Sequence, residues 1–477
     1  METKPRTIHE IVDWKRLILI ALGLCGIQFC WAIQVGHTTR TLLELGLAPN
    51  LVSMAWLAGP IAGIIVQPIV GSLSDRYQTR IGKRTPYILA GSFFSAIALL
   101  FFGNAVKLGK WLGDEETEEL DNQSVVRYGL VIAIVSFWLL DFSLNAAQGP
   151  LRALMADIAS SQQQEQGNAF FALMTGIGNL LGNGLGSLQL SEYVSFASSD
   201  ICALYTMGAI MISITSSICV FYAREKDRLS PTAACHHRSH YLTFTSEENE
   251  PMEESNNLDF QREEDGGLKD IISSAPSPFW KLFLIQCFTW FAWFTEFVFM
   301  TSWMGSEVMQ GNPNAQENSK ARSVFDYGVR MGNVGLSLQS LTSIAYSLVL
   351  PNLVKLLDIK YCYFWTQFLM GFCLCSTPIL TNLHSILWSI ICIALLGLPW
   401  ASTMTIPWAI ISRTLRTKAP ERIGMYSTIF NLSQCFPEIL VSIIAEKLLA
   451  HLNRQTMILA MGGVMAMLGS LLILTTL

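Results

Sequence analysis

Twelve apolar segments run through this chain of 477 residues, and each is about as long as a helix that crosses a lipid bilayer. A membrane helix needs about 20 predominantly apolar residues, because the hydrocarbon core is about 30 Å thick. The first segment follows a polar start without a small-residue cleavage site, so we expect an anchor helix rather than a removed signal peptide. The predicted spans are residues 17–37, 51–73, 87–103, 128–150, 169–189, 201–222, 279–300, 328–350, 361–380, 385–411, 423–445 and 455–475.

Charged side chains make up only 14% of the chain, whereas hydrophobic residues make up 51%. Soluble domains usually carry about 25% charged residues, so this composition argues against a soluble enzyme, a nucleic-acid-binding protein and a disordered scaffold. Ten of the 11 cysteines lie in strongly apolar stretches, and we expect neither a disulfide framework nor a metal site from them. The sequence around Gly82-Lys83-Arg84 lacks the remaining residues of a phosphate-binding loop. We therefore predict no enzymatic activity and no cofactor.

The basic residues predict the orientation of the spans. If both termini are cytoplasmic, the segments on that side hold 22 of the 31 Lys and Arg residues, and the opposite loops hold eight. Cytoplasmic loops of membrane proteins carry such an excess of positive charge. We expect a multi-pass protein of the plasma or vacuolar membrane with both termini in the cytoplasm.

One long polar segment divides the spans into six and six. It carries 12 acidic and six basic residues with few aromatics, which is typical of a disordered linker. Pro150 precedes Gly167 by 17 residues, and Pro407 precedes Gly424 by the same spacing, so the halves resemble two structural repeats around a central path. The predicted organisation is a cytoplasmic tail (1–16), a six-helix bundle (17–222), an acidic cytoplasmic linker (223–277) and a second six-helix bundle (278–477).

Glycines recur at four-residue spacing inside two spans. Small residues at this spacing allow two membrane helices to approach closely, so we interpret them as packing sites rather than chemistry. They are Gly59 and Gly63 in the second span, and Gly178, Gly182 and Gly186 in the fifth.

The fourth span carries a polar face inside the expected bilayer. Asp141, Asn145, Gln148 and Arg152 follow a 4-3-4 spacing, which places them on one side of a helix. Ionisable groups in hydrocarbon are costly and are usually functional or paired. Asp141 is the best candidate to gain and lose a proton, and Arg152 to supply a counter-charge or to donate to a sugar hydroxyl. The alternative is a static Asp–Arg pair that only holds the helix bundle together, but these two residues lie about three turns apart on one helix and cannot pair directly with each other.

Three more spans carry polar or aromatic candidates. Gln28, Trp31 and Gln34 recur at every third position of the first span, and amides flanking an aromatic ring are a combination that binds sugars. The alternative is helix-to-helix amide bonding, which is common in membranes. The seventh span repeats the spacing with Trp290, Trp293 and Glu296. Glu296 is a second protonatable group, a hydrogen-bond acceptor for the substrate, or a solvated carboxylate near the outer interface. Arg330 opens the eighth span and faces the path or extends to the interface.

The loop after the second span resembles the signature motif of the major facilitator superfamily, in the version seen in its glycoside-pentoside-hexuronide branch. Its residues are Gly71, Asp75, Arg76, Arg80, Gly82, Lys83 and Arg84. The resemblance implies the major facilitator fold and a conformational latch, in which Asp75 holds a helix N-terminus and the basic residues hold the loop at the cytoplasmic face.

Longer stretches are similar to sucrose transporters of plants and fungi: 26–34, 56–71, 140–154 and 289–294, with Asn431 in a similar eleventh span. In that family, the Asp and Arg of the fourth span are linked to proton coupling and sucrose transport, which implies those roles for Asp141 and Arg152. The chain departs from plant members at Glu296, Met300, Ser302 and Met331 and has no His in residues 47–50. These departures favour a fungal-type or other non-plant member.

The resemblance predicts a proton-coupled symporter that moves sucrose or a related α-glucoside such as maltose by alternating access. Its expected partners are the disaccharide, protons and the lipid bilayer; it uses no nucleic acid and works as a monomer. Three alternatives stay open: an uncoupled sugar facilitator, a vacuolar sugar exporter and a non-transporting sugar sensor.

Overall fold

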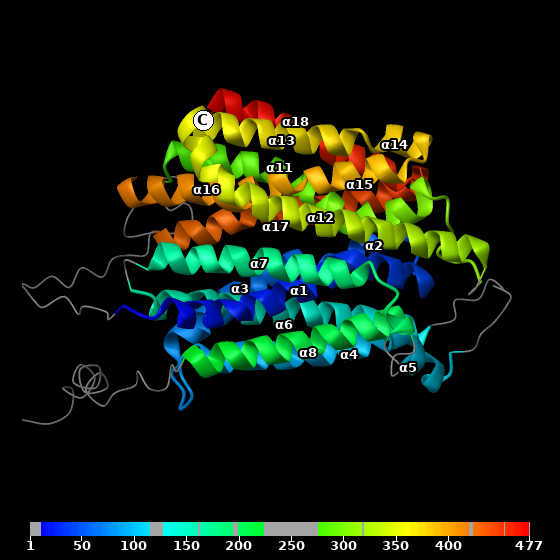
Figure 1. Ribbon diagram of the computed structural model, residues 1–477, viewed down its shortest axis with the longest axis horizontal. Helices are drawn as coiled ribbons and strands as arrows, with labels where there is room; N and C mark the ends of the chain where they lie inside the picture. Colours follow the sequence, from blue (N-terminus) through cyan, green and yellow to red (C-terminus); the bar gives the residue numbers. More distant parts are fainter. Residues whose placement is uncertain are drawn as a thin grey trace, which may run out of the picture.

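The computed structural model describes residues 11–114, 127–160, 163–193, 199–223, 275–316, 319–418, 423–452 and 454–476. The helices of these residues form two bundles that lie side by side, with their axes roughly along the long dimension of the molecule (Figure 1). The first bundle contains α1 (Trp14–Glu44), α2 (Pro49–Ala55), α3 (Ala58–Arg76), α4 (Thr85–Gly103), α5 (Ala105–Leu112), α6 (Tyr128–Ile158), α7 (Gln164–Gly186), the 3₁₀ turn η1 (Leu190–Glu192) and α8 (Asp200–Ala223).

The second bundle begins after the predicted linker, most of which (224–274) lies outside the described residues. It contains α11 (Ser277–Trp303), which continues as the π-helical turn η3 (Met304–Val308), and then α12 (Lys320–Leu357), α13 (Ile359–Cys375), α14 (Thr377–Leu383), α15 (Ile386–Leu395), α16 (Gly397–Lys418), α17 (Ile423–Leu452) and α18 (Gln455–Thr476). The all-α, two-bundle prediction is confirmed.

Within the described part of the chain, ten helices or helix pairs are long and apolar enough to cross a membrane. The two further predicted spans correspond to α7 and α17, which are diluted by polar residues such as Asn179 and Asn183 in α7 and Asn431 and Glu438 in α17. Both helices pack against the opposite bundle, α7 on α12 and α17 on α2 and α3. Their polar residues therefore need not face lipid, and the chain crosses the membrane twelve times.

Three of the twelve passes are interrupted, and each break has a proline in the first turn of the helix that follows. Pro60, Pro378 and Pro399 stand near the starts of α3, α14 and α16. Proline has no N–H for an i−4 carbonyl and its ring clashes with that carbonyl, but the first turn of a new helix tolerates it. Hydropathy predicts continuous spans at these places, and the breaks correct that prediction.

The glycines of the fifth span are packing sites, as expected. A methyl group added at Gly182 would lie 2.7 Å from the Cβ of Ala32, and one added at Gly186 would lie 2.6 Å from Nε2 of His37. At Gly178 it would collide with the carbonyl oxygen of Cys25. The glycine face of α7 therefore lies directly on α1.

The two bundles meet along α1, α2, α3 and α7 on one side and α11, α12 and α17 on the other. We name the end of the molecule at which α1 begins and α18 stops the basic end, because the 77–84 loop lies there. The opposite end, at which α1 stops and α12 begins, is the far end. In Figure 1 the basic end is on the left and the far end on the right.

Candidate functional site

Asp141 of α6 is the centre of the predicted polar face, and it is 4% exposed. Its Oδ1 accepts a hydrogen bond of 3.0 Å from Nε2 of Gln34 on α1. Its Oδ2 is buried and has no hydrogen-bond partner among the described residues. Trp31 of α1 also interacts with this carboxyl group. A buried carboxyl group with one satisfied oxygen and one free oxygen can take up a proton on the free one.

Asn145, one turn along α6, extends this polar centre to α3. Its Nδ2 donates to the backbone carbonyl of Asp141 over 2.8 Å, and its Oδ1 accepts from Nε2 of Gln67 over 2.6 Å. Gln67 belongs to α3 and was not among the predicted site residues, although amides inside a span were the signal used for α1. The structure thus brings Gln34, Gln67, Asp141 and Asn145 together from three helices.

The other two members of the α6 face lie closer to the basic end. Gln148 is buried, whereas Arg152 is exposed. Arg152 stands three turns along α6 from Asp141, so the two residues do not form an ion pair with each other. Gln28 of α1 is buried against α7, where a methyl group on Gly178 would lie 2.9 Å from its Cβ.

Trp290 and Trp293 of α11 belong to an aromatic cluster in the second bundle. The ring of Trp400 on α16 lies edge-on to both, at 6.2 Å from Trp290 and 4.9 Å from Trp293. Trp293 is fully buried, and its Nε1 donates to Oγ1 of Thr403 over 3.2 Å. Since Trp293 is fully enclosed, Trp290 and the half-buried Trp400 are the better placed of these rings to meet a ligand.

Glu296, one turn beyond Trp293, is 1% exposed, and neither of its carboxylate oxygens has a hydrogen-bond partner among the described residues. Gln339 of α12 lies beside it. This burial excludes the alternative of a solvated carboxylate at the membrane interface for this conformation. Arg330 of α12 is half-buried, and Asn431 of α17 lies 3.9 Å from Sγ of Cys435 through its Nδ2.

Glu438 of α17 is a buried carboxylate that the sequence analysis missed. It is 6% exposed and interacts electrostatically with Asp141. The signal was present in the sequence, because Glu438 is an acid inside the predicted span 423–445, as Asp141 is inside span 128–150. Among the described residues, no cluster of three or more His, Cys, Asp or Glu side chains could hold a metal ion.

The family model described as Major Facilitator Superfamily matches residues 20–442. The chain belongs to this superfamily. The fold agrees: the xylose transporter XylE from E. coli, in a partially occluded inward open conformation, is similar with a TM-score of 0.59 at 10% identity, over 97% of this chain and 99% of that one. A POT family transporter in complex with 5-aminolevulinic acid gives a TM-score of 0.64 at 12% identity, over 98% of this chain and 99% of that one.

Curated relatives narrow the comparison within the superfamily. Sucrose transport protein SUC3 of Arabidopsis thaliana is 27% identical, over 90% of this chain and 81% of its own length. Sucrose transport protein SUT2 of Oryza sativa subsp. indica is 29% identical, over 91% of this chain and 86% of its own length. The chain is thus a multi-pass membrane protein whose relatives are transporters and not enzymes.

The superfamily motif after α3 forms a tight turn at the basic end. Thr79 and Gly82 exchange backbone hydrogen bonds of 3.1 and 3.2 Å, and Gly82 has a φ of +129°, a conformation that a side chain would strain. Arg84 pairs with Asp157 of α6 at 3.0 Å and donates to Oγ of Ser74 over 2.8 Å. These contacts fix the loop within its own bundle. The side chain of Asp75 lies outside the described part, and the latch stays a prediction.

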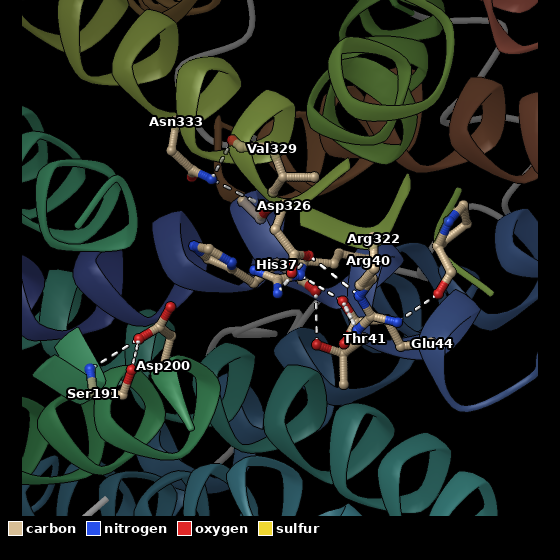
Figure 2. Close-up of polar contacts among 12 residues, drawn as sticks. His37, Arg40, Thr41, Glu44, Ser191, Asp200, Arg322, Asp326, Val329 and Asn333 are labelled. Carbon is tan, nitrogen blue, oxygen red and sulfur yellow. Dashed lines mark hydrogen bonds and ion pairs between the residues drawn. The ribbon is translucent and has the colours of Figure 1, made fainter. Parts of the chain in front are cut away.

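At the far end, four charged residues join the two bundles of this major facilitator chain (Figure 2). Arg40 of α1 pairs with Asp326 of α12 at 2.7 Å, and Arg322 of α12 pairs with Glu44 of α1 at 2.7 Å. Within each helix, Arg40 pairs with Glu44 at 2.6 Å and Arg322 with Asp326 at 3.4 Å. We call these four residues the far-end clasp. The predicted spans excluded all four, because both helices extend further than hydropathy indicates.

Uncharged contacts lie beneath the clasp and also connect the bundles. Oγ1 of Thr39 donates to the carbonyl of Val298 over 2.7 Å, and Oγ of Ser53 on α2 donates to the carbonyl of Ser442 over 2.9 Å. Nδ2 of Asn333 reaches the carbonyl of Gly36 at 3.5 Å (Figure 2). The far end is therefore closed in this structure.

Proposed function

We propose that this chain is a proton-coupled symporter of sucrose or a related α-glucoside such as maltose, which works by alternating access. The observation that carries the proposal is the buried, half-satisfied carboxyl group of Asp141 among the amides of Gln34, Gln67 and Asn145. Amide groups pair with sugar hydroxyls as both donors and acceptors. The names of the curated relatives supply the sugar, since they are sucrose transport proteins.

The basic end is the cytoplasmic end in this proposal. It carries the 77–84 loop and the beginning of α1, and cytoplasmic segments of membrane proteins carry the excess of Lys and Arg. Both termini are then cytoplasmic, and the far end faces the outside of a cell or the lumen of a vacuole. The chain acts as a single copy, because each copy has both bundles and the interface between them.

The transport cycle uses the interface between the bundles. With the far end open, Asp141 takes a proton from that side and sugar binds to the neighbouring amides, with Trp290 on the facing bundle. Closing the far end, as in this structure, and opening the basic end then exposes sugar and proton to the cytoplasm. Binding of both solutes is required for closure, so that a proton gradient drives uphill sugar movement.

Purified protein in liposomes tests the proposal with radiolabelled sucrose. We expect uphill accumulation when the far side is acidified, and exchange of labelled for unlabelled sucrose without a gradient. Asp141→Asn cannot carry a proton, so it should lose accumulation and keep exchange. Glu192→Gln, which removes an exposed carboxylate of η1 in the first bundle, should keep both activities.

Three outcomes would contradict the proposal. Sucrose exchange that ignores an imposed pH gradient in the unaltered protein would make it a facilitator. Sucrose binding without any exchange would make it a sensor. Full accumulation by Asp141→Asn would show that the proton uses another group.

A further inference from the structure

Two buried carboxylates from opposite bundles lie at the same level of the interface. Asp141 belongs to α6 in the first bundle and Glu438 to α17 in the second, and they are 4% and 6% exposed. Neither residue forms an ion pair with a Lys or Arg among the described residues. Two unpaired acids that face one another in a water-poor interior cannot both be charged without a large energetic cost.

The position of Glu438 opposite Asp141 follows from the register of α17 on α3. A methyl group on Gly63 of α3 would lie 2.9 Å from Sγ of Cys435, and one on Gly59 would lie 4.0 Å from Oδ2 of Asp141. The two helices run in opposite directions, so one turn from Gly63 to Gly59 corresponds to one turn from Cys435 toward Glu438.

A second contact supports the same register from the far end. Oγ of Ser53 on α2 donates to the carbonyl of Ser442, one turn beyond Glu438 on α17. Glu438 therefore lies between two fixed contacts of α17 with the first bundle. The free oxygen of Asp141 points to Gly59, a residue without a side chain to separate it from α17. An electrostatic effect of Asp141 on Glu438 agrees with this placement.

No other ionisable group of the packed helices takes the place of Asp141 beside Glu438. Cys435 on α17 interacts with Glu438 but is a thiol. Glu296 on α11 lies beside Gln339 of α12 instead. Neither α2 nor α18 contains an ionisable side chain. The remaining ones on helices packed against α17 stand at positions toward the basic end: Asp75 and Arg76 of α3, Lys281 and Cys287 of α11, and Arg413, Arg416 and Lys418 of α16.

We propose that Glu438 is a second proton-binding carboxylate of the transport path, which shares one proton with Asp141 when the far end is closed. This inference rests on the proposed symport function. The proton comes from water on the far side, binds one carboxylate oxygen of the pair, and leaves to water on the cytoplasmic side. A protonated pair lets the bundles close at the far end. After the proton leaves, the two negative charges repel each other and favour reopening, which returns the empty carrier.

Sucrose exchange measured at equal pH on both sides, from pH 5 to pH 9, tests the shared proton. A neighbouring negative charge strengthens the hold of Asp141 on its proton, so removing that charge weakens it. Glu438→Gln and the apolar, similarly sized Glu438→Met should therefore move the alkaline midpoint of exchange to lower pH by roughly one unit. Glu438→Asp should stay close to the unaltered protein, because the carboxylate is kept.

The matched control is Glu446→Gln, two turns further along α17, which removes one negative charge from the same helix and should leave the midpoint unchanged. Both Glu438→Gln and Glu438→Met are made, so that the midpoint can still be measured if one of the two variants does not fold. An unchanged midpoint in a folded Glu438→Gln or Glu438→Met protein would overturn the shared proton. Exchange without any pH dependence in the unaltered protein would instead overturn the symport function.

Discussion

The far-end clasp should control how long the far end stays closed, and Asp326→Asn is the substitution that tests it. Asp326 pairs with Arg40 across the bundles at 2.7 Å, and the two side chains are 21% and 9% exposed. Two unit charges about 4 Å apart at an effective dielectric of about 20 attract by about 4 kcal/mol. The cost of removing both from water offsets part of this attraction, and we take about 2 kcal/mol as the net contribution. The ratio of closed to open molecules should then fall about 30-fold.

Spin labels placed at the far ends of α2 and α15 would report this change as a distance distribution measured by electron paramagnetic resonance. Asp326→Asn should add a population with a longer distance, and Arg40→Met should do the same. The double variant should be close to either single variant, since each breaks the same pair. Glu192→Gln is the control, because its carboxylate is exposed at the same end, in η1 of the first bundle.

An unchanged distance distribution in Asp326→Asn would refute the reasoning, provided that the protein remains folded and still binds sucrose. Strictly additive effects of the two substitutions would show that Arg40 and Asp326 do not stabilise the closed state through their contact with each other. High salt offers an independent check. It should weaken the clasp only modestly, because partly buried pairs are screened less than exposed ones.

Two further predictions concern packing and sugar binding. Gly182→Ala places a methyl group against Ala32 and should lower the melting temperature of the detergent-purified protein by several degrees, whereas Gly184→Ala, whose methyl group would lie 3.9 Å from the nearest side chain, should not. Gln67→Leu removes the 2.6 Å hydrogen bond to Asn145 and should raise the sucrose concentration for half-maximal exchange about tenfold without moving its pH midpoint.

The number of spans and their positions could be predicted because hydropathy responds to the lipid environment, which acts on each segment separately. The polar face of α6 was also predictable from a 4-3-4 spacing, and the structure places Gln34 on Asp141 and Gln67 on Asn145. Neither contact could be predicted, since it depends on which helices become neighbours. The glycine spacing predicts that a helix packs closely at Gly182, but it does not predict that this helix is α1.

The clasp and Glu438 were missed for opposite reasons. Arg40 and Asp326 lie on helical extensions that are too polar to count as membrane spans, so an analysis of apolar segments assigns them to loops. Glu438 lies within a predicted span, but its proposed role depends on its closeness to Asp141. Asp141 is almost 300 positions earlier in the chain, so the sequence alone does not show that the two are neighbours. An isolated acid in one helix says little about its role, whereas two acids facing one another across an interface form a titratable pair.

The clasp and the carboxylate pair act on the same movement with opposite sign. The clasp pairs opposite charges from the two bundles, so it favours the closed far end regardless of what is bound. If clasp attraction alone operated, a carrier that had released its cargo would stay closed on that side. The repulsion between Asp141 and Glu438 arises only when the proton has left, and it opposes closure of the far end. Its free energy must be comparable to that of the clasp for the far end to reopen. This balance predicts that Asp326→Asn combined with Glu438→Gln should restore much of the closed population that Asp326→Asn alone loses at alkaline pH.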